Sequence, residues 1–375
     1  MAPISSGGYT GKVLRVDLSN ERISEESLED TTARKYLGGT SLGVKYLYDE
    51  VSPEVDWSES QNRVYVGAGP LGGTRIAGSG TFSVVTKGAM TNGVTSSQAN
   101  GFFGAYVKFS GFDGILIQGA ASGWKYLYVH DGKAELRDAQ HIVGKDTWET
   151  EELIKKELGY SGTGMSVFGI GPAGENLVRF AGIFGDSGHA ASHYGLGAVM
   201  GSKKLKAIAT SRSRGKVEVF NSSQLNTTAK QLVENFKKAM GGEIFNWGTS
   251  RLVGSAAKSG ILPVKNYTTN IFPEAENFDV RERFEVWKFP CWACPSSHHM
   301  HIRVTEGPYA GFSGKEPEYE QYAAWGPQIG QTDPGAAIVL ANEGDRLGFD
   351  CNEGSWVVGW VMECYEKGLH SSKDL

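Results

Sequence analysis

The 375-residue sequence has few cysteines, no dense basic run and no long apolar segment. Its four cysteines, Cys291, Cys294, Cys351 and Cys364, lie in the last quarter of the chain, too few for a disulfide scaffold and suited to a reducing compartment. No stretch approaches the roughly 18 apolar residues that span a bilayer, and the start, MAPISSGGYTGK, lacks the apolar stretch of a secretory signal. We therefore expect a cytoplasmic protein without a membrane segment.

The charge balance gives little sign of a nucleic-acid partner. Lys and Arg number 37 against 42 Asp and Glu, and the basic residues are spread along the chain. The 51 glycines are nearly twice the usual share of about 7% and are concentrated before residue 202. This composition predicts many tight turns and backbone-lined ligand surfaces.

Short strand patterns separated by Gly-rich turns dominate the first 210 residues. Leu14, Val16 and Leu18 alternate with Arg15 and Asp17, which predicts a strand over residues 12–18. Similar patterns predict further strands at residues 63–66, 82–86, 114–118, 126–130, 165–170 and 206–210. Helical patterns occur at residues 32–48 and 146–158. The N-terminal part is therefore an α+β domain rich in antiparallel strands.

Longer helical patterns follow after about residue 214, at residues 222–240, 335–347 and 355–367. The sequence shows no internal repeat. We predict two domains, 1–212 and 213–375.

Cys291 and Cys294 are separated by two residues in the run FPCWACP, so both sulfurs can reach one metal centre. An iron–sulfur cluster, a zinc site, a redox dithiol and two unconnected buried thiols all remain open. His298, His299 and His301 follow closely and favour a metal over a dithiol. For any one of them, a loop that happens to be rich in histidine is the simpler explanation.

Gly169, Gly171 and Gly174 formally match a dinucleotide-binding fingerprint, which would indicate a nicotinamide-dependent dehydrogenase. That fingerprint requires a helix to begin on the third glycine, so that its amides face the pyrophosphate. Residues 175–184 instead alternate like a strand. We interpret the run as a tight turn between strands.

Glu316, Glu318 and Glu320 alternate in sequence. On a strand or extended loop they would share one face and repel one another, which would raise the pKa of at least one carboxyl and keep it protonated for acid–base chemistry. A solvated acidic loop is the simpler alternative. Downstream, the run DRLGFD at residues 345–350 contains a plausible helix end at Gly348.

A series of short motifs is ordered along the chain: GGT at 38–40, GAGPL at 67–71, VVTK at 84–87, KFSGFD at 108–113, IGPAGEN at 170–176, GLGAVMGSK at 195–203, PVKN at 263–266, the Cys291/Cys294 run, PEYE at 317–320 and DRLGFD at 345–350. This order resembles the aldehyde:ferredoxin oxidoreductase family of tungsten- and molybdenum-pterin enzymes. The resemblance covers the chain from Gly8 to about Gly368.

The resemblance implies two pseudo-symmetric, mainly antiparallel β-sheets with helices, forming the base for a tungsten or molybdenum bis-pterin cofactor. An incomplete, mainly α-helical domain would follow. It also implies a 4Fe–4S cluster that passes electrons to ferredoxin or another low-potential carrier.

Individual site residues are implied in the same way. Cys291 and Cys294 match the first two cysteines of the family run Cys-x-x-Cys-x-x-x-Cys, and His298 stands at the third. Glu320 matches the catalytic carboxylate near the metal. The positions matched to cofactor binding are Asn100, Gly101, His189, Ala190, Asp345, Gly348, Phe349 and Asp350.

Some positions depart from the family. Thr81 and His189 stand where arginines approach the cofactor phosphates, which should weaken binding of a phosphorylated ligand, with Arg75 and Arg179 as available substitutes. Family members are longer, and their last part supplies a second aspartate run and a fourth cluster cysteine.

Val339 and Asn342 replace the Glu-x-x-His run that holds a bridging iron in some members, so that iron is not expected. The sequence thus predicts an oxidoreductase acting on an aldehyde or related oxo compound, with Glu320 moving a proton and with a partner chain, or the remainder of a longer protein, completing the site. Alternatively, Thr81, His189 and His298 mark a non-catalytic scaffold or binding relative that has lost part of the cofactor site.

Overall fold

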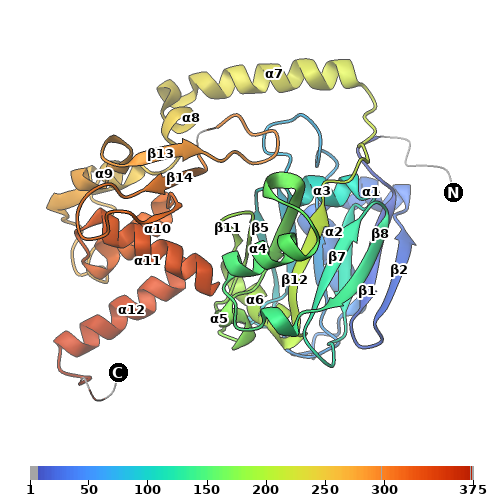
Figure 1. Cartoon of the computed structure of the whole chain (residues 1–375), viewed down its shortest axis with the longest axis horizontal. Helices are drawn as coiled ribbons and strands as arrows, with labels where there is room; N and C mark the ends of the chain where they lie inside the picture. The colour runs from blue at the N-terminus through green and yellow to red at the C-terminus, as the bar shows by residue number, and fades with distance from the viewer. Residues whose placement is uncertain (1–6, 297, 372, 374–375) are drawn as a thin grey trace. The chain divides into compact units, whose positions relative to one another are not determined.

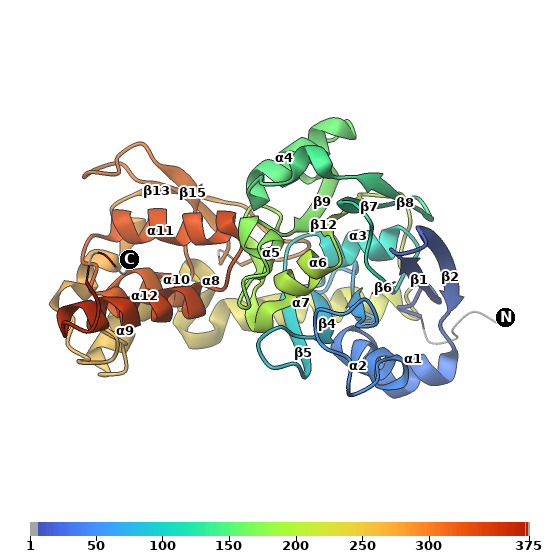
Figure 2. The same cartoon turned by 90° about the horizontal axis from the view of Figure 1, so that it is seen from below.

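The structure is a computed structural model that describes residues 7–296, 298–371 and 373 (Figures 1 and 2). The chain divides into two compact units. The first unit comprises Met1–Val233, Cys291–Cys294 and Arg346–Phe349, and the second comprises Glu234–Pro290, Pro295–Asp345 and Asp350–Leu375. Residues 1–6, which form part of the start that lacks a signal pattern, lie outside the described residues.

Two six-stranded sheets build the first unit. Sheet A has the order β2-β1-β6-β3-β4-β5 and contains β1 (Lys12–Asp17), β2 (Arg22–Ser27), β3 (Val64–Gly67), β4 (Phe82–Lys87), β5 (Val94–Ala99) and β6 (Gly114–Gln118). Sheet B has the order β11-β10-β9-β12-β7-β8 and contains β7 (Lys125–His130), β8 (Lys133–Asp138), β9 (Met165–Gly169), β10 (Ile183–Gly185), β11 (His189–Ala191) and β12 (Leu205–Ser211).

The two sheets repeat one topology, although the sequence shows no repeat. Numbered from β7, sheet B has the strand order of sheet A read from the opposite edge, so β1 corresponds to β7 and β5 corresponds to β11. Each sheet has one parallel pair, β1 with β6 and β7 with β12, and its other pairs are antiparallel. The expected pair of pseudo-symmetric, mainly antiparallel sheets is confirmed.

Six helices accompany the sheets: α1 (Asp30–Tyr36), α2 (Gly39–Glu50), α3 (Phe103–Phe109), α4 (Thr147–Glu157), α5 (Pro172–Glu175) and α6 (Leu196–Ser202). The single helix predicted over residues 32–48 is wrong. The chain breaks between α1 and α2 because Leu37 and Gly38 adopt positive φ angles of 60° and 152°. The predicted α4 is confirmed, and the Asp146 carboxylate caps it by accepting from the Glu149 N–H.

The sheets pack face to face around the main core. Apolar residues from both contribute, such as Leu14 and Val66 from sheet A and Leu127 and Ile208 from sheet B. The outer face of sheet A packs against α1 and α2, and that of sheet B against α4. Figure 2 shows the resulting four layers, with α1 and α2 on one side of the strands and α4 on the other.

Helices dominate the second unit: α8 (Glu243–Trp247), α9 (Leu252–Lys258), α10 (Tyr319–Trp325), most of α11 (Pro334–Leu347) and α12 (Cys351–Glu366). The division between the units falls within α7 (Ser222–Lys238). A small antiparallel sheet, β13-β14-β15 (Glu285–Lys288, Met300–Arg303, Ser313–Lys315), was not predicted. Among the described residues, no helix is long and apolar enough to cross a membrane.

Candidate cofactor and cluster site

The positions of the first unit that are matched to cofactor binding gather where its two sheets meet. The corresponding edge strands β5 and β11 lie side by side. Asn100 and Gly101 directly follow β5, and His189 and Ala190 lie on β11. The pseudo-symmetric fold therefore brings Asn100 and His189 to the same junction, although they are 89 positions apart in sequence.

Gly101 is packed too closely to carry a side chain. Its φ is +104°, and a Cβ atom there would lie 2.5 Å from the Asp186 Oδ2 atom. That Asp186 oxygen accepts hydrogen bonds from the Phe102 N–H at 2.7 Å and the Ser166 hydroxyl at 2.8 Å. Burial, with a smaller contribution from Glu151, raises the pKa of Asp186 to about 7. The backbone at the junction is therefore hydrogen-bonded to a buried carboxyl group.

Thr81 and Asn100 lie at the edge of this junction, where Thr81 is half-buried and Asn100 is exposed. The Thr81 hydroxyl donates to the Asn100 Oδ1 atom at 2.6 Å, which orients the amide. The two arginines considered as substitutes for lost phosphate-binding cations lie elsewhere: the Arg179 guanidinium lies over the Trp57 ring, and Arg75 lines a separate pocket with Arg212.

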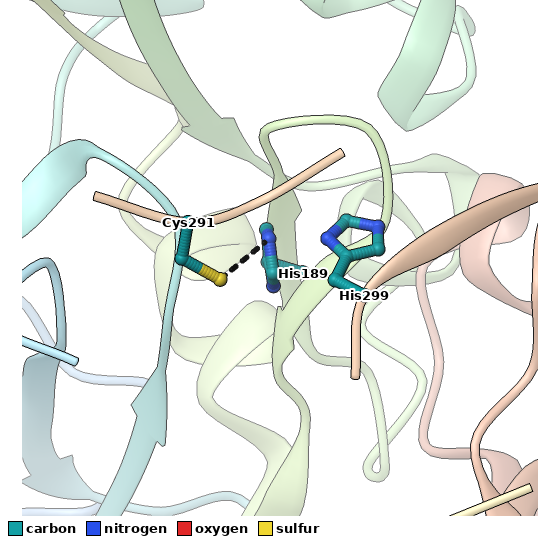
Figure 3. Close-up of side chains that lie close together, drawn as sticks. All are labelled: His189, Cys291 and His299. Carbon is teal, nitrogen blue, oxygen red and sulfur yellow. Dashed lines mark hydrogen bonds between the residues drawn. The ribbon is translucent and has the colours of Figure 1, made fainter. Parts of the chain in front are cut away.

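Cys291 faces His189 at the junction (Figure 3). The Cys291 Sγ atom lies 3.5 Å from the His189 Nε2 atom. The pKa of the Cys291 thiol is raised to about 12, chiefly by burial. The nearby Cys294 and Asp186 contribute to this increase. His189, matched to a cofactor-binding position, is therefore also a neighbour of Cys291, which is matched to a cluster position.

The Cys291–Cys294 segment is a tight turn fixed to the first unit. Cys294 donates its N–H to the Cys291 carbonyl at 3.1 Å, and Ala293 has φ of 53°. Trp292 anchors the turn, because its backbone N–H donates to the Gly101 carbonyl and its indole N–H donates to the Thr74 carbonyl, each at 3.0 Å. Both thiols are thus held within one turn beside Gly101.

The DRLGFD run is shared between the units. In the first unit, the Gly348 carbonyl accepts from the Gly182 N–H at 3.0 Å and Phe349 pairs with Ala181. Gly348 has φ of +85° and lies so close to Gly171 that a Cβ atom would come within 2.8 Å of its nitrogen. These two residues therefore fix the backbone of the run.

The aspartates of this run belong to the second unit. Asp345 is buried, accepts from the Gln321 amide at 2.8 Å and lies 3.6 Å from the Lys315 ammonium; its pKa is raised, chiefly by burial. Asp350 caps α12 by accepting from the Asn352 N–H at 2.9 Å. Both carboxylates thus accept hydrogen bonds within the second unit.

Residues 316–320 form neither the shared acidic face nor the solvated acidic loop that the sequence left open. Glu316 is buried in a bidentate ion pair with Arg281, both contacts measuring 2.5 Å. Glu318 is the N-cap of α10, and Glu320 lies in its first turn. Because a helix begins at Tyr319, the period-2 alternation ends there and the three carboxylates separate.

Glu320 is exposed and lines a pocket of about 250 Å³ within the second unit. Aromatic and apolar side chains form most of the wall: Ile261, Pro263, Tyr267, Tyr319, Ala323, Ala324 and Trp356, with Gln328 and Asn352 as polar members. An exposed carboxylate is thus placed beside a small, largely apolar cavity.

The histidines after the cysteine turn lie in the second unit. The His298 Nε2 atom lies 3.3 Å from the Thr249 hydroxyl and 3.8 Å from a Glu318 oxygen. His301 stacks on Trp287 across β13 and β14, at 5.6 Å between ring centroids, so strand packing accounts for it. The role of His298 as a cluster ligand stays a prediction.

Sequence reasoning missed Asp186 and the anchoring role of Trp292. Asp186 occupies the turn between β10 and β11, and it contacts residues about 85 positions earlier in the chain. The only local signals were the GDSG turn at residues 185–188 and a tryptophan between the two cysteines.

A base of two pseudo-symmetric sheets, with a cysteine turn where their edge strands meet, is the architecture expected of this class of pterin-dependent oxidoreductase. The family model for the aldehyde ferredoxin oxidoreductase N-terminal domain matches residues 13–212, and the model for domains 2 and 3 matches residues 224–375. The chain belongs to the aldehyde ferredoxin oxidoreductase family.

Similar proteins include the tungsten-containing aldehyde ferredoxin oxidoreductase of Pyrococcus furiosus, 36% identical over 373 residues that make up 98% of this chain and 60% of that protein. The aliphatic sulfonate oxidoreductase, WOR-like subunit, of the same organism is 32% identical over 98% of this chain and 61% of its own length. The chain spans about three fifths of the length of these relatives.

Among solved structures, the active site complex BamBC of benzoyl coenzyme A reductase, with 1,5-dienoyl-CoA, is similar with a TM-score of 0.86 and 26% identity. The match covers 98% of this chain and 57% of that one.

Proposed function

We propose that this chain forms the cofactor base and cluster segment of a tungsten- or molybdenum-pterin oxidoreductase that converts an aldehyde or related oxo compound. The observation that carries the proposal is the convergence of Gly101, His189 and the Cys291–Cys294 turn at the β5–β11 junction. When bound, the metal–pterin group supplies the two-electron step, and a 4Fe–4S cluster passes the electrons on singly to ferredoxin or another low-potential carrier.

The residues at the junction fit these groups. Two thiols in one turn suit a metal cluster, and the imidazole of His189 lies next to one of them. Gly101 has no side chain that would keep a cofactor away from the backbone, and the exposed amide of Asn100 can hydrogen-bond to a cofactor. Cys291 and Cys294 would hold the cluster, and Asn100, Gly101, His189 and Ala190 would contact the pterin.

The DRLGFD run would contact a pterin through Asp345, Gly348, Phe349 and Asp350. A buried carboxylate such as Asp345 can accept N–H donors from a pterin ring while Lys315 balances its charge. For this role the Asp345 carboxylate must be able to accept further hydrogen bonds besides those from Gln321 and Lys315. Its two oxygens have enough lone pairs for this.

Glu320 would move a proton at the substrate. Oxidation of an aldehyde with water to a carboxylic acid releases two protons and two electrons, and the exposed Glu320 carboxylate can accept one of those protons. The apolar wall of its pocket, with Tyr267, Tyr319 and Trp356, would hold the organic group of the substrate away from water.

A further polypeptide would complete the enzyme. The relatives are longer than this chain by about two fifths of their own length, and α12 exposes Trp356, Val357, Trp360 and Tyr365 by 41–55% of each residue's surface. Apolar faces of this kind mark interaction surfaces. We infer that the polypeptide corresponding to the rest of the family length covers α12, either as a second chain or as the remainder of a longer one.

An anaerobic assay of aldehyde-dependent reduction of a viologen dye tests the function. The metal-loaded, completed protein should reduce the dye, and Glu320→Gln should lower kcat at least about 100-fold because proton transfer is lost. The matched change Glu276→Gln, at an exposed position of the second unit away from α12, should leave kcat within about twofold.

A non-catalytic scaffold is the competing function. Its support is that Thr81 bonds Asn100 and supplies no cation there, so one expected phosphate contact is missing. A stable, colourless protein that reduces no dye, even when completed, would favour the scaffold over the enzyme.

A further inference from the structure

A basic pocket lies beside the cysteine turn of the first unit. Its volume is about 550 Å³. Four cationic residues line it, namely Arg75, Arg212, Arg214 and Lys216. The remaining lining residues carry no carboxylate: Gly73, Thr74, Phe109, Ser213, Gly215, Val217, Val219, Ser222, Leu225, Asn226 and Trp292.

The charges in this pocket are uncompensated within the part of the chain that the structure describes. No ion pair there involves any of the four cationic side chains, whereas most other arginines of the first unit have carboxylate partners, such as Arg15 with Glu50. All four are exposed. Four like charges around one cavity create a positive potential that attracts an anionic partner.

Trp292 connects the pocket to the candidate cluster cysteines. Its side chain forms part of the pocket wall, and the Arg212 guanidinium lies 5.5 Å from the centre of its ring. Its neighbour Cys291 and the nearby Cys294 are the two proposed cluster ligands. A partner seated in the pocket would thus be separated from the cluster segment by one aromatic side chain.

We propose that this pocket is the docking site for an acidic, iron–sulfur electron-carrier protein. The proposal rests on the proposed function, because a carrier must approach the cluster held by Cys291 and Cys294. Each docking event moves one electron from the reduced cluster to the oxidised carrier, and no covalent bond forms or breaks. Charge complementarity favours a carrier whose docking face is rich in Asp and Glu.

The test measures binding directly. A small acidic ferredoxin is titrated calorimetrically into the metal-loaded protein and into the triple variant Arg212→Gln, Arg214→Gln, Lys216→Gln. Removing three cations should weaken the affinity at least about tenfold at low salt, and added salt should weaken the affinity of the unmodified protein. A control triple variant, Arg22→Gln, Lys35→Gln, Lys133→Gln, removes three exposed cations elsewhere in the first unit and should change affinity less than about twofold.

Equal weakening by the two triple variants would overturn the proposal. So would micromolar binding of inorganic tripolyphosphate that the pocket variant abolishes while ferredoxin binding is unchanged, because the pocket would then serve a small polyanion. Dye reduction by the unmodified protein is measured separately. Its failure with ferredoxin binding intact would contradict the proposed oxidoreductase function and leave the docking site standing.

Discussion

The two units bury apolar surface very differently. In the first unit, every residue of β4 and β12 is buried between layers that the unit itself supplies. In the second, α12 buries only Gly354, Ser355, Gly359 and Cys364 of its sixteen residues, and it exposes Trp360 by 55%. The first unit is therefore closed by its own layers, whereas the second unit leaves apolar side chains of α12 exposed, the face on which we propose that a further polypeptide packs.

The interior of the first unit also contains a buried ion pair. The Lys108 ammonium is paired with the Asp113 carboxylate, and the two side chains are 0% and 2% exposed. Lys108→Met would leave Asp113 as an uncompensated buried charge and should lower the free energy of unfolding by about 3–5 kcal/mol. Urea denaturation measures this loss.

The control for that change is Lys12→Met, which breaks an ion pair with Glu25 whose side chains are 51% and 43% exposed. Its cost should stay below about 1 kcal/mol. Similar losses for the two variants would show that the first unit is not the closed core described above.

The buried acid at the sheet junction makes stability depend on pH. The pKa of Asp186 is about 7 in the fold against an ordinary value of 3.8, so the folded chain holds a proton that the unfolded chain releases. This contribution is present below about pH 4 and is lost as pH rises through about 7. Asp186→Asn stays neutral and should therefore stabilise the metal-free chain by about 1–3 kcal/mol at pH 8, with little change at pH 4.

Denaturation midpoints at the two pH values check this difference. Asp131→Asn removes a carboxyl whose side chain is 66% exposed and serves as the matched control. If both Asn variants behave alike at pH 8, burial does not raise the pKa of Asp186 as described above.

The smallest effect is expected on α12. Trp360→Ala should change the free energy of unfolding by less than about 1 kcal/mol, because its side chain is largely in water. It should, however, reduce the binding of a fluorescent hydrophobic dye. Trp325→Ala, at a site 5% exposed in the same unit, should cost about 3–5 kcal/mol. A large cost at Trp360 would mean that α12 is already covered.

Sequence patterns predicted the bounds of several strands and helices well. The strand expected at residues 114–118 is β6 (Gly114–Gln118), and the helix expected at 335–347 is α11 to within one residue. The helices α3 and α6 were missed because six of seven residues in each are buried, so neither has a polar face that would reveal a helical period. β5 was missed because its sequence, VTSSQA, is mostly polar.

The candidate site was only partly predictable for a related reason. The cysteine spacing is local, so Cys291 and Cys294 were visible in the sequence. The contacts of Gly101 with Asp186 and of Cys291 with His189 join residues 85 and 102 positions apart and arise only when β5 meets β11. The acidic alternation did not predict a helix, yet α10 begins at Tyr319 with a capping box between Glu318 and Gln321.

The central claim is that the Cys291–Cys294 turn at the sheet junction holds a metal centre. Elemental analysis and visible absorption of the anaerobically purified, completed protein test it most directly. We predict iron together with tungsten or molybdenum, and loss of the iron and its absorption in Cys291→Ser. Both should be retained in Cys364→Ser, which replaces a buried thiol on α12. A protein without iron, or one whose iron is unchanged in Cys291→Ser, would contradict it.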